Sequence, residues 1–175
     1  VVTDGGGVFG RLVEGRSARF LGLSDVGRRA SGRLAAGPTE EAGATIHSAV
    51  TLLEREGYTF RDVARTWFYL KDILDWYGPF NAVRNEAFHK LGLMGRNGDG
   101  AIPASTGIRG RNARGHRCTF DLLAARPLAG GDFSVERLFN PLQNEAPEYG
   151  SSFSRGLSIA TDKCRYFLVS GTASI

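Results

Sequence analysis

Two short stretches of this chain carry side chains suited to binding a small molecule. Residues 148–156 read Glu-Tyr-Gly-Ser-Ser-Phe-Ser-Arg-Gly, and residues 170–175 read Ser-Gly-Thr-Ala-Ser-Ile. An arginine binds a carboxylate through two parallel hydrogen bonds, and serine and threonine hydroxyls both donate and accept. Side chains of these kinds suit the binding of an anionic, hydroxylated ligand. The predicted substrate-binding residues are Tyr149, Ser152, Phe153, Arg155, Thr172 and Ser174.

Each of these residues also has a plain structural interpretation. Arg155 could be an exposed strand arginine that forms surface ion pairs. Tyr149 and Phe153 could belong to the core, since buried aromatic rings more often pack than bind. The hydroxyls could be satisfied by neighbours within strands. Both interpretations stay open at the level of sequence.

Other site chemistries are not favoured. The serines lack a Gly-x-Ser-x-Gly motif and a nearby histidine and aspartate, so covalent serine catalysis is not expected. Gly5 to Gly7 lacks the spacing of a nucleotide-binding loop. The histidines at positions 47, 89 and 116 do not have metal-ligand spacing. We expect no metal and no cofactor, and we assign no catalytic residue.

Composition is that of an ordinary globular protein. The chain has 175 residues, of which 42% are hydrophobic and 23% charged. No apolar run approaches the ~18 to 20 residues of a membrane helix, and no secretory signal is visible, so a cytoplasmic location and no membrane partner are expected. Two cysteines are too few for a disulfide framework.

The net charge of +4 is concentrated in arginine-rich segments. The cluster from Arg109 to Arg117 alternates with glycine and asparagine and has no aromatic residues to stack on bases, so a nucleic-acid partner is not favoured. Two interpretations remain, a solvated hairpin loop and an anion-facing loop.

Hydrophobic periodicity predicts the order β-β-α-β-α-β-β. Apolar residues at helical spacing follow Thr39, a plausible N-cap, as far as Gly57. The other expected elements are two strands within 8–23, a strand at 63–71, a helix at 76–91, and a hairpin of 104–108 with 118–125. Two helices on one face of a small mixed sheet make an α/β (α+β) domain.

The opening hairpin is repeated. An offset of 146 residues relates Gly10 to Gly156, Arg19 to Arg165 and Ser24 to Ser170. A two-stranded hairpin alone is marginal in water. We therefore expect a domain over 1–127, a linker over 128–147, and over 148–175 the first hairpin of a second, incomplete unit. The chain would then be part of a two-domain protein.

The element order, Ser170-Gly171 and Pro103-Ala104-Ser105 together resemble the RidA/YjgF/L-PSP endoribonuclease superfamily. That resemblance implies a fold shared with small chorismate mutases, homotrimers, and ligand sites between subunits. The chain is more similar to a two-domain branch, the chorismatases, and looks like its N-terminal half. This similarity rests on residues 67–70, 73–77, 80–84, 103–108, 149–155 and 170–175.

The chorismatase resemblance implies a hydrolase that releases pyruvate from chorismate without a cofactor. Ser105 stands where RidA deaminases have a carboxylate-binding arginine, so deaminase activity is not expected. The family's catalytic glutamate would lie outside this chain. The alternative function is that of a RidA-like trimeric protein that binds small anionic metabolites without catalysis. RNA cleavage is the third candidate function.

Overall fold

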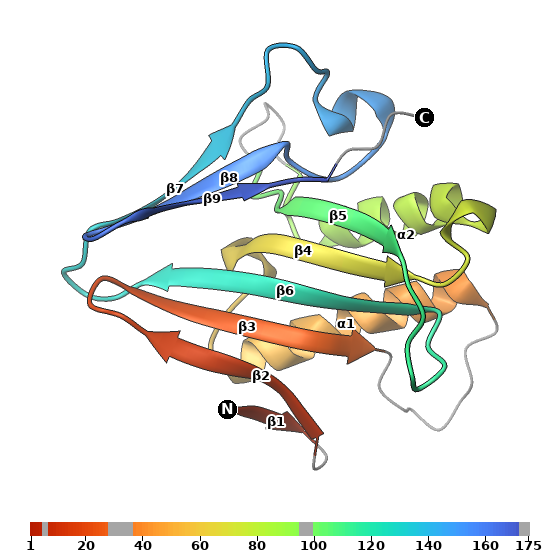
Figure 1. The fold of residues 1–175 in the computed structure, drawn as a ribbon, viewed down its shortest axis with the longest axis horizontal. Helices are drawn as coiled ribbons and strands as arrows, with labels where there is room; N and C mark the ends of the chain where they lie inside the picture. Colours follow the sequence, from red (N-terminus) through yellow and green to blue (C-terminus); the bar gives the residue numbers. More distant parts are fainter. Residues whose placement is uncertain (5–6, 28–36, 95–99, 172–175) are drawn as a thin grey trace.

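The computed structural model describes residues 1–4, 7–27, 37–94 and 100–171. Its main element is a six-stranded sheet with the order β1-β2-β3-β6-β4-β5 (Figure 1). The strands are β1 (Val2–Asp4), β2 (Gly7–Glu14), β3 (Ala18–Gly27), β4 (Val63–Leu70), β5 (Ala104–Arg109) and β6 (Cys118–Pro127). Strand β6 pairs with β3 and with β4, and both of these strands are distant from it in sequence.

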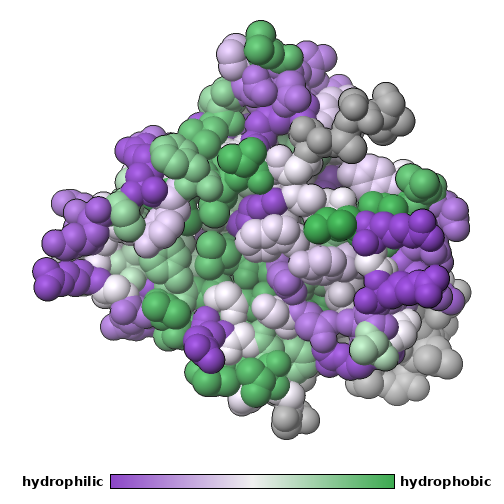
Figure 2. Space-filling view, viewed as in Figure 1, coloured by the Kyte–Doolittle hydropathy of each residue, from purple (hydrophilic) through white to green (hydrophobic). Residues whose placement is uncertain are grey.

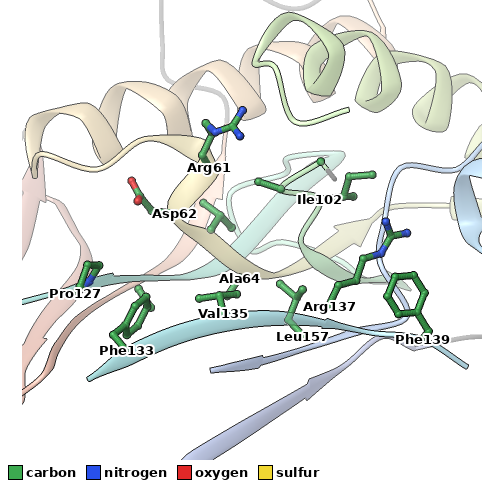
Figure 3. Close-up of a pocket in the computed structure, with 14 residues that line it drawn as sticks. Arg61, Asp62, Ala64, Ile102, Pro127, Phe133, Val135, Arg137, Phe139 and Leu157 are labelled. Carbon is green, nitrogen blue, oxygen red and sulfur yellow. The ribbon is translucent and has the colours of Figure 1, made fainter. Parts of the chain in front are cut away.

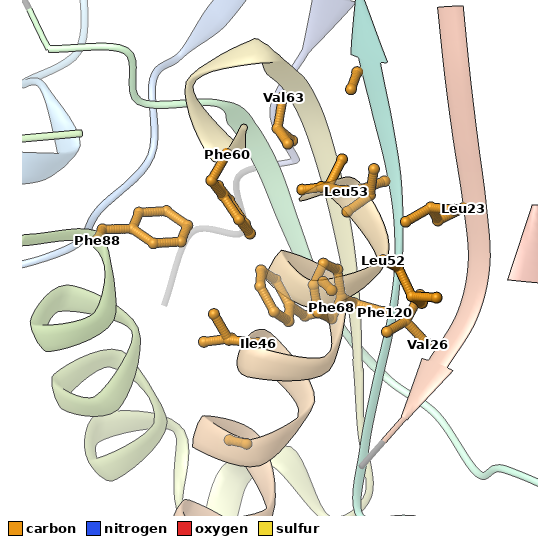
Figure 4. Close-up of a cluster of buried hydrophobic side chains, with 14 of the residues drawn as sticks. Leu23, Val26, Ile46, Leu52, Leu53, Phe60, Val63, Phe68, Phe88 and Phe120 are labelled. Carbon is orange, nitrogen blue, oxygen red and sulfur yellow. The ribbon is translucent and has the colours of Figure 1, made fainter. Parts of the chain in front are cut away.

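Two helices, α1 (Pro38–Arg55) and α2 (Tyr77–Lys90), cover one face of this sheet (Figure 1). Rings and branched side chains of both layers interdigitate, and Phe68 is stacked on Phe120 with the ring centroids 4.7 Å apart (Figure 4). The Phe68 ring also lies edge-on to Phe80, at 5.0 Å between centroids. This burial is the main stabilising contribution to the fold. The predicted fold class is confirmed. Helix α1 begins at Pro38 with Gly37 as N-cap, so Thr39 lies inside the first turn.

The predicted hairpin of 104–108 with 118–125 is wrong. Strand β5 pairs in parallel with β4, and β6 lies between β3 and β4, antiparallel to both. The segment β4-α2-β5 is a crossover unit, which places β5 beside β4 on one side. The other edge of β4 is then free to pair with β6. The second edge of β6 pairs with β3, which is distant in sequence.

A three-stranded sheet, β7-β8-β9, lies on the face opposite the helices (Figure 1). Its strands are β7 (Phe133–Leu138), β8 (Gly156–Thr161) and β9 (Arg165–Val169). Leu157 and Ile159 pack on Ala64, Ala104 and Ala125 of the main sheet. Figure 2 shows apolar side chains gathered on the side of this face where the two sheets meet. The segment 128–147, expected to be a linker, therefore contains a strand.

Candidate ligand-binding site

A cleft of about 560 Å³ opens between β5, α2 and the segment that joins β7 to β8. One wall comes from the N-terminal part of α2 and from β5, and the other from residues 143–155 together with Gly171. Its charged and aromatic lining residues are Tyr77, Arg84, Arg109, Tyr149, Phe153 and Arg155. The cleft thus combines residues from segments far apart in sequence.

Hydrogen bonds to the start of β5 hold the two predicted stretches together. The Ser154 amide donates to the Pro103 carbonyl at 3.0 Å. The Ser105 amide donates to the Ser170 hydroxyl at 2.8 Å, and the Gly171 amide donates to the Thr106 hydroxyl at 2.9 Å. The first two of these bonds link buried residues, and together the three bonds fix both stretches against the main sheet.

The predicted site residues fall into three groups. Tyr149, Phe153 and Arg155 line the cleft. Ser152 is fully buried, donates to the Asn85 side-chain oxygen at 2.5 Å, and is not among the lining residues. Thr172 and Ser174 lie outside the described residues. The sequence pattern therefore brings three of its six residues to one cleft.

Arg155 packs against two aromatic rings that also contact each other. Its guanidinium carbon lies 5.5 Å from the ring centroids of both Tyr149 and Phe153. Its Nε also donates to the Asn144 carbonyl at 3.0 Å. A cation over two ring faces is attracted by their negative π-surface, so the guanidinium is oriented before any ligand arrives.

Arg84 is the charged residue that the sequence interpretation missed. It lies on α2, is only 1% exposed and lines the cleft. Its Nη2 donates to the Asn81 side-chain oxygen at 2.9 Å, and its Nε has no hydrogen-bond partner among the described residues. Burial lowers the pKa of Arg84 to about 10, because desolvation disfavours the charged form. The group is still charged at neutral pH.

A signal for Arg84 was present in the helical pattern. Phe80, Arg84 and Phe88 are spaced by four residues, so they occupy one face of α2. Both phenylalanines are fully buried. A cation on the buried stripe of a helix is rare unless it has a partner, and this position was therefore detectable from the sequence.

The described lining of the cleft carries positive charge without a carboxylate. Arg109 lies at the rim and is 3.6 Å from Asp72, a loose exposed pair. The other arginines are Arg84 and Arg155, and the described lining residues include neither aspartate nor glutamate. Such a site attracts an anion, and arginines at separate positions favour a ligand with more than one negative group.

A second cleft, of about 440 Å³, lies between the two sheets (Figure 3). Phe133, Val135 and Leu157 of the second sheet contribute much of its apolar lining. Its described lining includes a carboxylate, Asp62, and one of its arginines, Arg137, pairs with Glu145 at 2.6 Å. The first cleft is therefore the better candidate for an anion.

The basic loop from Arg109 to Arg117 is tied to acidic residues. Arg114 forms an ion pair with Asp25. The Arg117 amide donates to Glu41 at 2.9 Å, and the His116 ring is 3.3 Å from the same carboxylate. These contacts anchor the loop to β3 and α1. They account for part of its charge without a nucleic-acid partner.

The described residues set limits on a metal site and on a membrane-spanning helix. No group of three or more His, Cys, Asp or Glu side chains within 1–4, 7–27, 37–94 and 100–171 is placed to hold a metal ion. Neither helix in these ranges is long and apolar enough to cross a membrane.

Comparison with known proteins identifies the fold. No family model matches the sequence, and no curated protein matches it. Among solved structures, the YjgF gene product of E. coli has a TM-score of 0.57 at 18% identity, covering 71% of this chain and 91% of its own. E. coli TdcF with bound serine has a TM-score of 0.56 at 16% identity, with the same coverage. A putative endoribonuclease of Thermotoga maritima has a TM-score of 0.52 at 18% identity, and the match covers 69% of this chain and 87% of the Thermotoga chain. The chain has the YjgF-like fold.

Proposed function

We propose that the cleft binds a small metabolite carrying two carboxylates, and that chorismate is the candidate ligand. The observation that carries this proposal is Arg84, a buried cation that faces the cleft beside Arg155 without a carboxylate among the described lining residues. A dicarboxylate would compensate both charges, and the rings of Tyr149 and Phe153 would line one side of a ring-shaped ligand. TdcF, which has a similar fold, was solved with bound serine. The protein would act in the cytoplasm as a RidA-like metabolite-binding protein, in the family's usual homotrimer.

Hydrolysis of chorismate is the catalytic form of this proposal. A general acid would protonate the methylene carbon of the enol ether, water would add to the resulting cation, and collapse of the hemiketal would release pyruvate and the ring alcohol. This chemistry needs a carboxyl group of raised pKa in a closed pocket. None of the described lining residues is acidic, so the acid would come from another part of the protein.

Imino-acid deamination is less well supported. The position that carries the family's carboxylate-binding arginine is Ser105, whose hydroxyl accepts a hydrogen bond from Thr66 at 2.9 Å. Arg84 and Arg155 approach the cleft from other elements, so a ligand would bind in a different orientation from that in the deaminases.

Calorimetric titration with chorismate and with benzoate, a ring that has one carboxylate, tests the binding proposal. We expect chorismate to bind at least about tenfold more tightly, because only chorismate engages both arginines. Arg155→Ala should weaken chorismate binding, whereas Arg16→Ala, at an exposed position in the β2–β3 turn, should leave it unchanged. Equal affinities for the two ligands would refute the dicarboxylate assignment.

A coupled assay with lactate dehydrogenase separates binding from hydrolysis. Release of pyruvate from chorismate, lost in Arg155→Ala, would support the hydrolase. Tight binding without release above background would support the non-catalytic alternative.

A further inference from the structure

The β8–β9 hairpin repeats the β2–β3 hairpin residue for residue. In the β2–β3 hairpin Gly10 is paired with Leu23 and Glu14 with Arg19. In the β8–β9 hairpin Gly156 is paired with Val169 and Ala160 with Arg165. The offset of 146 residues that relates the sequences therefore also relates the strand registers. A one-residue slip in register would move every side chain of a strand to the other face of the sheet. Because the two registers match, equivalent residues of the two hairpins lie on equivalent faces.

Glycine occupies the same close contact in both hairpins. A Cβ on Gly10 would lie 2.2 Å from the Gly22 carbonyl oxygen, and a Cβ on Gly156 would lie 3.0 Å from the Leu168 carbonyl oxygen. Gly22 and Leu168 are themselves equivalent under the offset. A third strand extends each hairpin on the same side, β1 beside β2 and β7 beside β8. The β8–β9 hairpin is thus a copy of the β2–β3 hairpin, and β7 takes the place beside it that β1 has beside β2.

The two copies differ in what covers them. In the first copy, Leu21 and Leu23 are 0% and 1% exposed because α1 and its neighbours pack on them. The equivalent residues of the second copy, Phe167 and Val169, are 63% and 66% exposed. Strand β3 is hydrogen-bonded on both sides, by β2 and β6, whereas β9 is bonded only to β8 within the described residues.

We propose that the free edge of β9 and the face bearing Phe167 and Val169 are covered by further polypeptide of the same protein, consisting of a strand equivalent to β6 and a helix equivalent to α1. An unpaired edge strand with exposed apolar side chains is a site for strand addition. The first copy shows which elements fit. Another copy of residues 1–175 is the poorer occupant, because its own α1 and β6 are already packed in its main sheet.

Thiol labelling tests this proposal in a Cys164→Ser background, where the remaining Cys118 is buried. Phe167→Cys reports on the face in question. Val8→Cys, at a strand position that is 70% exposed, is the matched control. Reaction rates with a disulfide reagent are measured in residues 1–175 and in the whole polypeptide encoded by the gene. Val169→Cys is a second reporter if Phe167→Cys fails to fold.

In residues 1–175, both reporters should react at similar rates that are independent of protein concentration. In the whole polypeptide, Phe167→Cys should react at least about a hundredfold more slowly, because labelling then requires local opening, whereas Val8→Cys should be unchanged. Rapid labelling of Phe167→Cys in the whole polypeptide would overturn the proposal. Protection in residues 1–175 that grows with protein concentration would also overturn it, and would assign the face to a second copy of the chain.

Discussion

Phe20 and Tyr166 occupy equivalent positions in the two hairpins, and their rings contact each other. The centroids are 5.7 Å apart and the planes meet at 72°, an edge-to-face arrangement. Phe20 packs with the cluster between the sheets, away from α1. The repeated hairpin is therefore placed on the face of the main sheet that the helices leave open, and its equivalent face points inward.

This ring contact should be measurable as a coupling energy. Phe20→Ala and Tyr166→Ala, alone and together, should show a coupling of about 0.5–1.5 kcal/mol in urea unfolding, since aromatic pairs add this much beyond their buried area. Phe167 lies next along β9 but faces the other way, so the Phe20–Phe167 cycle is the control and should show no coupling. Equal coupling in both cycles would contradict the packing described for β9.

Glycine at position 10 should be required by the close approach of β3. Gly10→Ala would place a Cβ 2.2 Å from the Gly22 carbonyl oxygen and should destabilise the protein by about 1–3 kcal/mol or more. Gly22→Ala meets nothing within 4 Å and should be neutral or stabilising by up to about 1 kcal/mol, because alanine restricts the unfolded chain. Chemical denaturation of both variants checks the difference, and equal losses of stability would contradict the register of β2 and β3.

Arg84 should matter for ligand binding more than for folding. Arg84→Met removes a buried charge that has no ion-pair partner among the described residues, so the free energy of unfolding should be unchanged within about 1 kcal/mol or should rise. Affinity for a dicarboxylate should fall at least about tenfold. Denaturation and calorimetry on the same samples test both parts. A large loss of stability with unchanged affinity would make Arg84 a structural residue.

The pH dependence of binding should also report on Arg84. Burial lowers its pKa to about 10 in the free protein, and a bound anion would raise the pKa by stabilising the charged form. Affinity should therefore be constant below about pH 10 and fall above it, by up to about tenfold per pH unit. Titrations from pH 7 to 10.5 test this, with Arg84→Met as the control that should lack the Arg84-dependent fall. A loss of affinity already near pH 8 would point to another group.

The two cysteines should differ sharply in reactivity. Cys164 is exposed, and hydrogen bonds with Tyr166 and Thr161 lower its thiol pKa, whereas burial raises the pKa of Cys118. Because the thiolate is the reactive form, one thiol per native chain should react rapidly with a disulfide reagent. The second should react only after unfolding. Cys164→Ser should abolish the rapid phase, and a rapid phase that persists would mean that Cys118 is accessible.

Local sequence patterns predicted most of the elements and the fold class. Apolar residues at helical spacing marked α1 and α2, and the alternation in residues 63–71 marked β4. Strands β1 and β7 were missed because each is short and lies among glycines and polar residues. The repeat offset predicted the β8–β9 hairpin, because identical spacing of strand residues leads to the same register.

The sequence by itself determined the helices, most of the strands and the repeated hairpin, because these depend on periodicity over a few residues. It also pointed to Tyr149, Phe153 and Arg155 as possible site residues. Only the tertiary structure placed β6 between β3 and β4, turned Ser152 toward Asn85, and brought Arg84 to the same cleft as Arg155. Those outcomes depend on which distant strands compete for a sheet edge and which faces become buried together, and neighbouring residues in the chain do not encode them.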